Sequence, residues 1–432
     1  MKRRPETACR IVILPVELAG VAAGLQGGLR QLGRDVDVLL IQPHNFAYPY
    51  ARPASRLRAW VFRIVLINAA SDGTRRGRIR SLMARLSVVP FLMSYDAVVY
   101  MGADTLIPGG WDRRLLKFVG LRVITIFCGS DARPPYLSGR WANPENGPVD
   151  MESLLLATRR TSKAVALAER DSTYVVNHPA TAQFNRRPFL DWTVMGMPSP
   201  APVADPVSSL PEVREGAVRV LHAPSVTRWK GTAQVREAVS ALRKEGLEIE
   251  YVEVKGRSNA EVLHEISVAD IVVDELHSDA LLAGLGTEAA RSGTAVLMTG
   301  NAVSLVRSLA ERVGAPHDHY SRPDEFVDTL RRLVVTPEHR ADLARRLHEF
   351  VSHAWSPSAI SLRYAAVLDG KPEASWFDDP SAAPYLGGWG VDEGKVRNLI
   401  QKFIDAFGVD ALGLNPAGMS AVASLPECSG EE

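Results

Sequence analysis

Two cations and a glycine in one short stretch are the residues of this sequence best suited to chemistry. Arg228 and Lys230 stand two residues apart after an apolar run at 218–221, and Gly231 follows where a helix is expected to begin. A helix N-terminus offers unpaired backbone N–H groups and the positive end of its dipole, and nearby cations add full charge. The stretch 218–232 therefore predicts an anion site, unless Arg228 and Lys230 are simply two solvated loop charges.

A carboxylate further along the chain indicates which anion to expect. Glu288 is the lone acid of a second strand–loop–helix unit, in the stretch GLGTEAARSGTAVL at 284–297. Cations on one loop and an acid at the start of a later helix suit a nucleotide diphosphate. The cations would take the pyrophosphate, and the acid would accept hydrogen bonds from the ribose hydroxyls.

The bulk properties limit the classes of protein that remain. At 432 residues the chain is too long for one ordinary core, and two domains are expected. The net charge of +1 and the 46% hydrophobic content predict a soluble globular protein with no general attraction to nucleic acid. No uninterrupted apolar segment reaches the ~18 residues that a membrane span needs. A reducing cytoplasm is expected, because the widely spaced cysteines fit neither a disulfide framework nor a zinc site: Cys9, Cys128 and Cys428.

Alternating strands and helices predict an α/β fold with two Rossmann-like parallel-sheet domains that face each other across a cleft. Apolar runs predict strands at 10–14, 37–41, 97–101, 123–127, 163–168, 173–176, 218–221, 249–254, 271–273 and 295–298. The proline-rich stretch 198–217 reads as a linker. It would separate an N-terminal domain at 1–197 from a C-terminal domain at 218–370. The remainder, 371–432, is expected to be a partly disordered extension with one helix at 393–407.

Two further stretches of the N-terminal half point to ligands. Glycines at 20, 24, 27 and 28 are expected before a helix that ends near Gly33, where the backbone could approach a ligand closely. Their spacing does not match G-x-G-x-x-G, so no nicotinamide site is expected. The stretch 52–85 contains nine arginines against the single acid Asp72, with Trp60 and Phe62 among the interleaved apolar residues. This pattern favours an anionic membrane surface or a polyanionic acceptor, the alternative being a solvated helix face.

These motifs together resemble the GT-B glycosyltransferases, in particular the retaining, nucleotide-sugar-dependent glycosyltransferase family 4 (glycosyl transferases group 1). The resemblance covers roughly residues 10–369 and rests on four stretches. They are HAPSVTRWKGT, ADIVVDELHSDALLAGLGTEAARSGTAVL, GADTLIPGG and FCGSDAR.

The resemblance implies a role for each matching residue. The donor site would contain Gly27, Gly28, Ser225, Arg228, Lys230, Gly231, Gly286, Thr287 and Glu288, with Gly27 and Gly28 forming a turn near the phosphates. The residues facing donor and acceptor would be Gly129, Ser130, Asp131 and Arg133, and the candidates for catalysis are Asp131, Arg228 and Lys230.

The chain departs from the family pattern at two positions. Many relatives have a glutamate eight positions before the ribose acid, where this chain has Ala280. Asp279 is one position off and Glu275 lies further back, so the acid that partners the sugar hydroxyls is unassigned. Many relatives also have a histidine before the G-S-D sequence, and Cys128 in its place is a poor hydrogen-bonding group.

The resemblance implies transfer of a hexose from a nucleotide-diphosphate sugar to a glycan, lipid-linked or small-molecule acceptor, with retention. Arg228, Lys230 and the helix N-terminus would stabilise the departing diphosphate, so neither a metal nor another cofactor is expected. The alternatives are a GT-B-type sugar-nucleotide epimerase and a catalytically inactive relative that acts as a scaffold. A cytoplasmic protein is expected, attached to the inner face of the membrane if 52–85 binds anionic lipid. Three histidines near predicted loops are expected to be structural: His178, His222 and His277.

Overall fold

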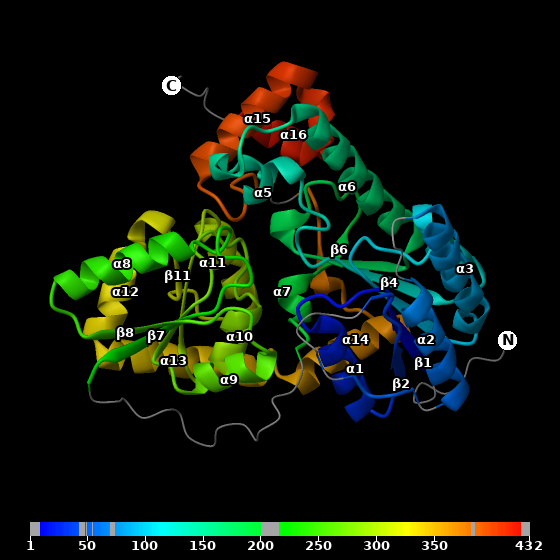
Figure 1. Cartoon of the computed structure of the whole chain (residues 1–432), viewed down its shortest axis with the longest axis horizontal. Helices are drawn as coiled ribbons and strands as arrows, with labels where there is room; N and C mark the ends of the chain where they lie inside the picture. The colour runs from blue at the N-terminus through cyan, green and yellow to red at the C-terminus, as the bar shows by residue number, and fades with distance from the viewer. Residues whose placement is uncertain are drawn as a thin grey trace. The chain divides into compact units, whose positions relative to one another are not determined.

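The computed structural model describes residues 9–42, 48, 50–53, 55–69, 74–199, 216–381 and 385–424. These residues form two compact units, each built on its own sheet (Figure 1). The first unit contains 9–132, 160–199 and 357–381, and the second contains 133–159, 216–356 and 385–424. Two parallel-sheet units confirm the predicted α/β fold class.

The first unit is built on a seven-stranded sheet with the order β12-β6-β5-β4-β3-β1-β2. The strands are β1 (Arg10–Leu14), β2 (Asp35–Val38), β3 (Ala97–Met101), β4 (Arg122–Ile126), β5 (Tyr174–Asn177), β6 (Phe189–Asp191) and β12 (Phe377–Asp378). All neighbours are parallel except β12, which pairs antiparallel with β6. The central strands are almost wholly buried, as expected for a parallel sheet covered on both faces.

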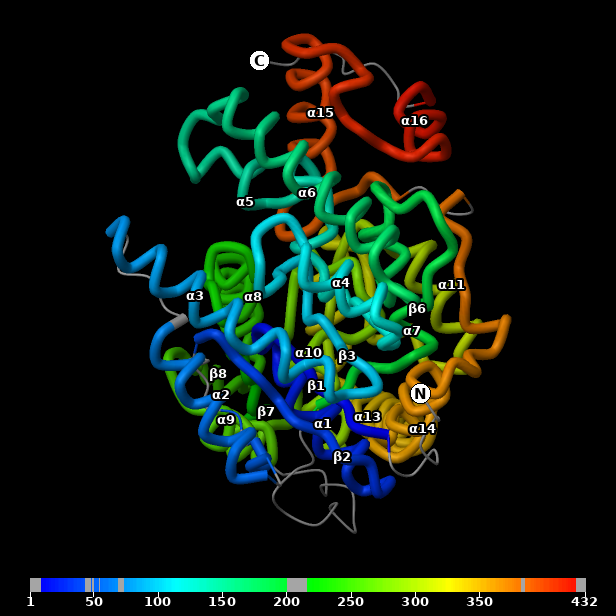
Figure 2. The backbone as a smooth tube through the Cα atoms, turned by 90° about the vertical axis from the view of Figure 1, so that its right-hand side faces the viewer, coloured from blue at the N-terminus to red at the C-terminus, as the bar shows by residue number. Residues whose placement is uncertain are grey.

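Helices of the first unit pack on this sheet and on one another. They are α1 (Val21–Gln31), α2 (Arg56–Ala69), α3 (Arg75–Leu92), α4 (Trp111–Phe118), α7 (Trp192–Met195), α14 (Pro357–Asp369) and the second half of α6 (Met151–Asp171). The helices α2 and α3 lie side by side (Figure 2). Their buried residues, including Val65 and Leu92, join a core cluster with residues of β1 and β3.

The second unit is built on a five-stranded parallel sheet with the order β11-β10-β9-β7-β8. Its strands are β7 (Val218–His222), β8 (Ile249–Glu253), β9 (Ile271–Val273), β10 (Ala295–Thr299) and β11 (Tyr320–Ser321). Helices cover both faces (Figure 1). They are α8 (Thr232–Lys244), α9 (Asn259–Ser267), α10 (Gly284–Arg291), α11 (Val303–Val313), α12 (Phe326–Val335) and α13 (Pro337–His353).

A small helical module completes the second unit and consists of residues 133–159 and 385–424. It contains α5 (Gly139–Ala142), the start of α6, α15 (Glu393–Phe407) and α16 (Pro416–Ala423). Tyr136, Leu154 and Phe403 belong to its hydrophobic core. Short 3₁₀ helices, in this module and in the rest of the described chain, span Pro108–Gly110, Pro135–Leu137, Pro144–Asn146, Pro179–Thr181, Pro323–Glu325, Ala374–Trp376 and Val409–Leu412.

The predicted division of the chain at one linker differs from the structure. Residues 133–159 leave the first unit because Tyr136 and Leu154 pack with Phe403 of the helical module. Residues 357–381 return to the first unit, where β12 pairs with β6. Most of the predicted linker, and the expected disorder at the C-terminal end, lie outside the described residues.

Three local predictions are wrong. The extension at 371–432, expected to contain one helix, contains α16 as well as α15. The expected strand at 163–168 lies inside α6, because its alanine- and leucine-rich sequence continues a long helix built from strong helix formers. The expected turn at Gly27 and Gly28 lies inside α1. A Cβ atom at Gly28 would stand 1.9 Å from Oγ of Ser361, so this glycine allows close approach of the chain at α14. Gly27 is exposed on the same helix, and a Cβ atom there would have open space.

Candidate anion-binding site

The predicted anion-binding loop lies at the carboxyl end of the sheet in the second unit. It connects β7, which ends at His222, to α8, which begins at Thr232. The neighbouring strand β9 ends at Val273 and is followed directly by Asp274 and Glu275. Since parallel strands end at the same edge, both loops lie where open α/β sheets bind ligands.

Lys230 is held between the two acids that follow β9. Its ammonium group forms an ion pair with Oε1 of Glu275, and Nζ lies 3.6 Å from Oδ1 of Asp274. The Lys230 side chain is 17% exposed. Burial lowers the pKa of Lys230, and the charge of Asp274 acts in the opposite direction. The lysine is thus a fixed cation at the sheet edge.

Asp274 joins this lysine to the start of α10. Its Oδ2 atom accepts a hydrogen bond of 2.8 Å from the backbone N–H of Gly286, in the first turn of that helix. The first N–H groups of a helix have no partner within the helix. Asp274 therefore satisfies one of these N–H groups, and the N–H of Gly286 is taken by a protein carboxylate.

The N-terminus of α8 is open by comparison. Gly231 precedes the helix with a φ of 72°, and among the described residues no side chain caps this end. A Cβ atom at Gly231 would lie 2.6 Å from Cβ of Leu276, so the loop and the segment after β9 touch here. The N–H of Thr232 donates to the carbonyl of Thr227 at 3.3 Å, and the N–H groups that follow it in the first turn, beside Lys230, are of the kind that binds phosphate.

His222 and His178 have structural roles, as expected. His222 is buried, with Nδ1 2.8 Å from the carbonyl oxygen of Val273 and Nε2 2.9 Å from Oγ1 of Thr232. Burial lowers its pKa, which favours the neutral ring. Nδ1 of His178 accepts a hydrogen bond from the backbone N–H of Ala180 and so closes a turn of the first unit.

Arg228 has different surroundings from Lys230, although the two are separated by one residue. The guanidinium of Arg228 donates a hydrogen bond of 2.6 Å from Nη1 to Oδ1 of Asn146, in the helical module. Arg228 and Ser225 are both exposed. The two cations therefore have different partners within the described residues. Lys230 is bound to the acids after β9, and Arg228 is bound to Asn146.

Glu288 lies one turn inside α10 and does not open it, because the helix begins at Gly284. Its Oε1 atom accepts a hydrogen bond of 2.9 Å from Nδ2 of Asn259. No hydrogen bond reaches Oε2 from the part of the chain that the structure describes. Burial raises the pKa of Glu288, and the nearby charge of Asp274 adds to this effect. The neighbouring Thr287 is buried, and its hydroxyl donates to the carbonyl of Ala283.

The acids that the sequence left unassigned have definite partners. Nη2 and Nε of Arg133 donate to Oδ2 of Asp279 at 2.5 and 3.2 Å. The guanidinium also lies over the ring of Trp389, 5.2 Å from its centre. Sequence reasoning missed the roles of Asp274, Glu275 and Trp389. The Asp-Glu pair at the end of an apolar strand was a usable signal, whereas nothing local marked Trp389.

The loop that follows β4 holds the remaining predicted residues, which belong to the first unit. The carboxylate of Asp131 accepts hydrogen bonds from the backbone N–H of Cys128, with oxygen distances of 3.0 and 3.2 Å. Gly129 has a φ of 126°, which glycine adopts readily. Cys128 and Ser130 are exposed. This loop is thus a tight turn that presents polar groups after a parallel strand.

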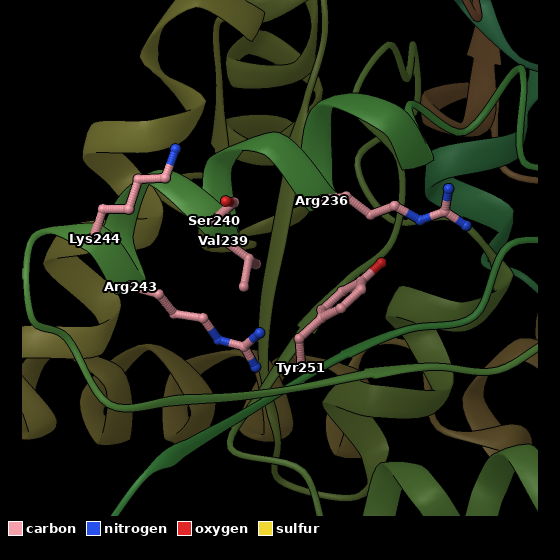
Figure 3. A pocket seen from close by; sticks show the side chains of 6 residues that line it. All are labelled: Arg236, Val239, Ser240, Arg243, Lys244 and Tyr251. Atoms are coloured by element: carbon pink, nitrogen blue, oxygen red, sulfur yellow. The ribbon is translucent and has the colours of Figure 1, made fainter.

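A cavity of about 540 Å³ lies between α8 and β8 (Figure 3). The residues that line it are Arg236, Val239, Ser240, Arg243, Lys244 and Tyr251. Its two arginines are already bound, Arg236 to Glu253 at 2.7 Å and Arg243 to the carbonyl of Ile249 at 2.8 Å. None of the predicted donor-site residues lines this cavity, so it is separate from the Lys230 site.

Neither family models nor curated proteins match this chain. Among solved structures, it is similar to WaaG, a glycosyltransferase involved in lipopolysaccharide biosynthesis, at 14% identity and a TM-score of 0.49, covering 83% of this chain and 99% of that one. The catalytic domain of starch synthase IV from Arabidopsis thaliana, bound to ADP and acarbose, gives the same identity and score, with 83% and 100% covered. HepE from Anabaena in complex with UDP-glucose has 14% identity and a TM-score of 0.47, with 83% and 99% covered.

Proposed function

We propose that this protein is a GT-B glycosyltransferase that transfers a hexose from a nucleotide-diphosphate sugar to a glycan, lipid-linked or small-molecule acceptor, with retention. The observation that supports it best is the placement of Lys230 beside the open N-terminus of α8, at the carboxyl edge of a parallel sheet. Glu288 follows on α10, two residues after Gly286, whose backbone N–H is bound by Asp274. This order of groups suits a diphosphate followed by a ribose.

The chemistry follows from the donors that remain free. An ammonium group has three N–H donors. Within the described residues the hydrogen bond to Glu275 accounts for one of them, and Asp274 lies at ion-pair distance, 3.6 Å from Nζ. The remaining ammonium donors and the N–H groups of α8 can bind the diphosphate, whose charge grows as the sugar leaves. Arg228 adds a second, more exposed cation from the same loop. By the family resemblance, Asp131 is the further candidate for catalysis.

Nucleotide release from donor sugars tests this function directly. The protein is incubated with UDP-, ADP-, GDP- and TDP-hexoses, chosen by a thermal-shift screen, with and without candidate acceptors. A transferase releases nucleotide slowly alone and faster with its acceptor. An epimerase would interconvert the sugars without an acceptor, and an inactive scaffold would release no nucleotide. Either of these last two results would overturn the proposal.

We expect activity to persist when divalent metals are removed. Lys230, Arg228 and the N-terminus of α8 supply positive charge for the diphosphate without a metal. Turnover measured in EDTA, against a sample with Mg²⁺ or Mn²⁺ restored, checks this. An absolute requirement for the metal would contradict it.

We expect Glu288→Gln to raise the donor KM roughly tenfold with little change in kcat. The amide is a weaker acceptor for the ribose hydroxyls in both the ground and transition states. Because burial raises the pKa of Glu288, the wild-type carboxylate is lost as the pH falls through that raised value. Donor affinity should therefore weaken at acidic pH in the wild type, and the variant should lack this dependence. Glu237→Gln, at an exposed position on α8, is the control. Identical KM values and pH profiles for wild type and variant would remove Glu288 from the donor site.

The basic stretch forms the helices α2 and α3 and exposes large apolar side chains. Trp60 is 61% exposed and Ile67 is 64% exposed, and both share one face of α2 with the exposed Arg56 and Arg63. Phe62, which the sequence pattern groups with Trp60 as an interfacial residue, is buried in the core, so it does not join this exposed face.

Not every arginine of this stretch adds to the surface charge. Arg58 is bound to Asp35 and Asp37 and is therefore neutralised. No helix in the described ranges is both long and apolar enough to cross a membrane. We propose that α2 and α3 attach the protein to the inner, anionic face of a membrane.

We expect salt-sensitive binding to vesicles that contain phosphatidylglycerol and none to vesicles of phosphatidylcholine alone. The arginines supply long-range attraction, and Trp60 and Ile67 insert at the interface. Flotation at low and high salt measures the binding, and Trp60→Ser should reduce it severalfold. Trp111→Ser, which changes another exposed tryptophan of the same unit, is the matched control. The membrane proposal fails if the wild type does not float with anionic vesicles at low salt.

A further inference from the structure

Residues 385–391 of the C-terminal region pass along the carboxyl end of the sheet in the second unit. The backbone N–H of Gly390 donates to the carbonyl of His277, at 2.9 Å, four residues beyond the end of β9. The side-chain amide of Asn301, just after β10, donates to the carbonyls of Gly387 and Val391 at 2.8 and 3.1 Å. The segment is therefore fastened to the loops that follow two central strands.

This segment brings the indole of Trp389 to the acid that holds Lys230. The indole N–H donates a hydrogen bond of 2.9 Å to Oε2 of Glu275, while Lys230 pairs with Oε1. Both oxygens of Glu275 are thus engaged, one from the anion-binding loop and one from the C-terminal region. On the other side, Lys230 faces Asp274, whose second oxygen is bound by Gly286.

The ring of Trp389 has its own neighbours. The guanidinium of Arg133 lies over one face, and the ring of Trp229 is tilted against it with centres 6.3 Å apart. Trp229 stands between Arg228 and Lys230 in the anion-binding loop. The indole is therefore placed by contacts that do not depend on its N–H group.

We propose that Trp389 is a positioning residue of the donor site, acting on the diphosphate-binding lysine through Glu275. The inference rests on the proposed function and adds the C-terminal region to the site. The hydrogen bond to Glu275 fixes one N–H of Lys230, so the orientation of Glu275 sets the directions in which the other two N–H groups can reach a ligand. The indole N–H fixes this orientation. It also offsets part of the negative charge that Glu275 would otherwise present to an incoming diphosphate.

The test compares binding of UDP, ADP, GDP, TDP and inorganic pyrophosphate by calorimetry. Trp389→Phe removes the N–H but keeps an aromatic ring for Arg133 and Trp229. We expect it to weaken binding of the nucleoside diphosphate and of pyrophosphate by about three- to tenfold, the range for one lost hydrogen bond. Asn301→Ala should weaken binding in the same direction, because it releases the segment without changing Trp389.

Two comparisons separate positioning from general loosening. Tyr385→Phe removes a hydrogen bond of 2.8 Å to the carbonyl of Gly388 within the same segment and should leave binding unchanged. In a Glu275→Ala background, Trp389→Phe should have no further effect, since the indole acts through that carboxylate. The inference is overturned if Trp389→Phe binds as the wild type does, or if its effect is undiminished in the Glu275→Ala background.

The outcomes also separate this inference from the proposed function. A wild-type protein that binds pyrophosphate but no nucleoside diphosphate would contradict the glycosyltransferase, and the role of Trp389 would still be decided with pyrophosphate. Binding of neither would overturn both.

Discussion

Lys230→Ala is expected to lower kcat/KM for the nucleotide sugar by about 10- to 150-fold, equivalent to roughly 1.5–3 kcal/mol. The variant loses a charge-assisted contact to the diphosphate and leaves Asp274 and Glu275 facing the ligand without their cation. Charge on the bridging oxygen grows as the sugar leaves, so part of the loss should appear in kcat. Steady-state kinetics over a range of donor concentrations gives both constants.

Removing Lys230 also affects the folded protein, and the experiment must separate the two effects. Two neighbouring buried acids lose their cation and keep only the hydrogen bonds from Trp389 and Gly286, so the midpoint of thermal unfolding should fall. Activity is therefore compared well below that midpoint. Lys255→Ala is the matched control, because this half-exposed lysine pairs with Glu253 at 2.6 Å, outside the site. If folded Lys230→Ala binds and turns over the donor normally, the glycosyltransferase proposal falls.

Arg228→Ala should also lower kcat/KM for the nucleotide sugar, but by less than Lys230→Ala does. Arg228 is exposed and bound only to the neutral Asn146 within the described residues, so water can replace much of its contact with a ligand. The two variants therefore rank the cations, which the sequence pattern alone treats as an equivalent pair.

Gly231→Ala is expected to reduce the free energy of unfolding by about 3 kcal/mol. Gly231 has a φ of 72°, and a Cβ atom would stand 2.6 Å from both Cβ and Cδ1 of Leu276. The methyl group can be accommodated only if the loop moves away from the segment that carries Glu275. Urea unfolding measures the loss of stability, and donor binding should weaken in parallel.

Gly256→Ala provides the matched comparison for this prediction. Gly256 has a similar φ of 64°, but a Cβ atom there would meet nothing within 4 Å. It should therefore lose only the cost of the left-handed backbone, about 1–2 kcal/mol. Equal losses for the two glycines would show that the contact with Leu276 carries no energetic weight.

Local pattern predicted the elements of this fold well. The strands β1, β3 and β9 begin and end where the apolar runs do, because each is a short buried run flanked by polar or turn residues. The helix α15 also has its predicted bounds. The strand prediction for residues 163–168 failed because alternating small and apolar residues fit a strand pattern as well as a buried helix face. Only the full length of α6 decides between them.

The candidate site was predictable only in part. Lys230 and Gly231 could be found because strand, loop and helix are contiguous in sequence. The partners of Lys230 could not be assigned, since Asp274 and Glu275 reach it through the order of strands in the sheet. Trp389 lies more than a hundred residues beyond Glu275, in a stretch without periodic pattern, and its place depends on contacts such as Gly390 with His277.

The path of the chain between the two units has a consequence for biosynthesis. On a ribosome, the strands β1 to β6 emerge long before α14 and β12, which complete the first unit. The edge of β6 that β12 covers thus stays unpaired while the whole second sheet is translated, and an unpaired edge invites association with other chains. Likewise, residues 133–159 emerge early and wait for α15 to cover Tyr136 and Leu154. Neither unit is a contiguous fragment, so expression of either half alone would yield an incomplete core.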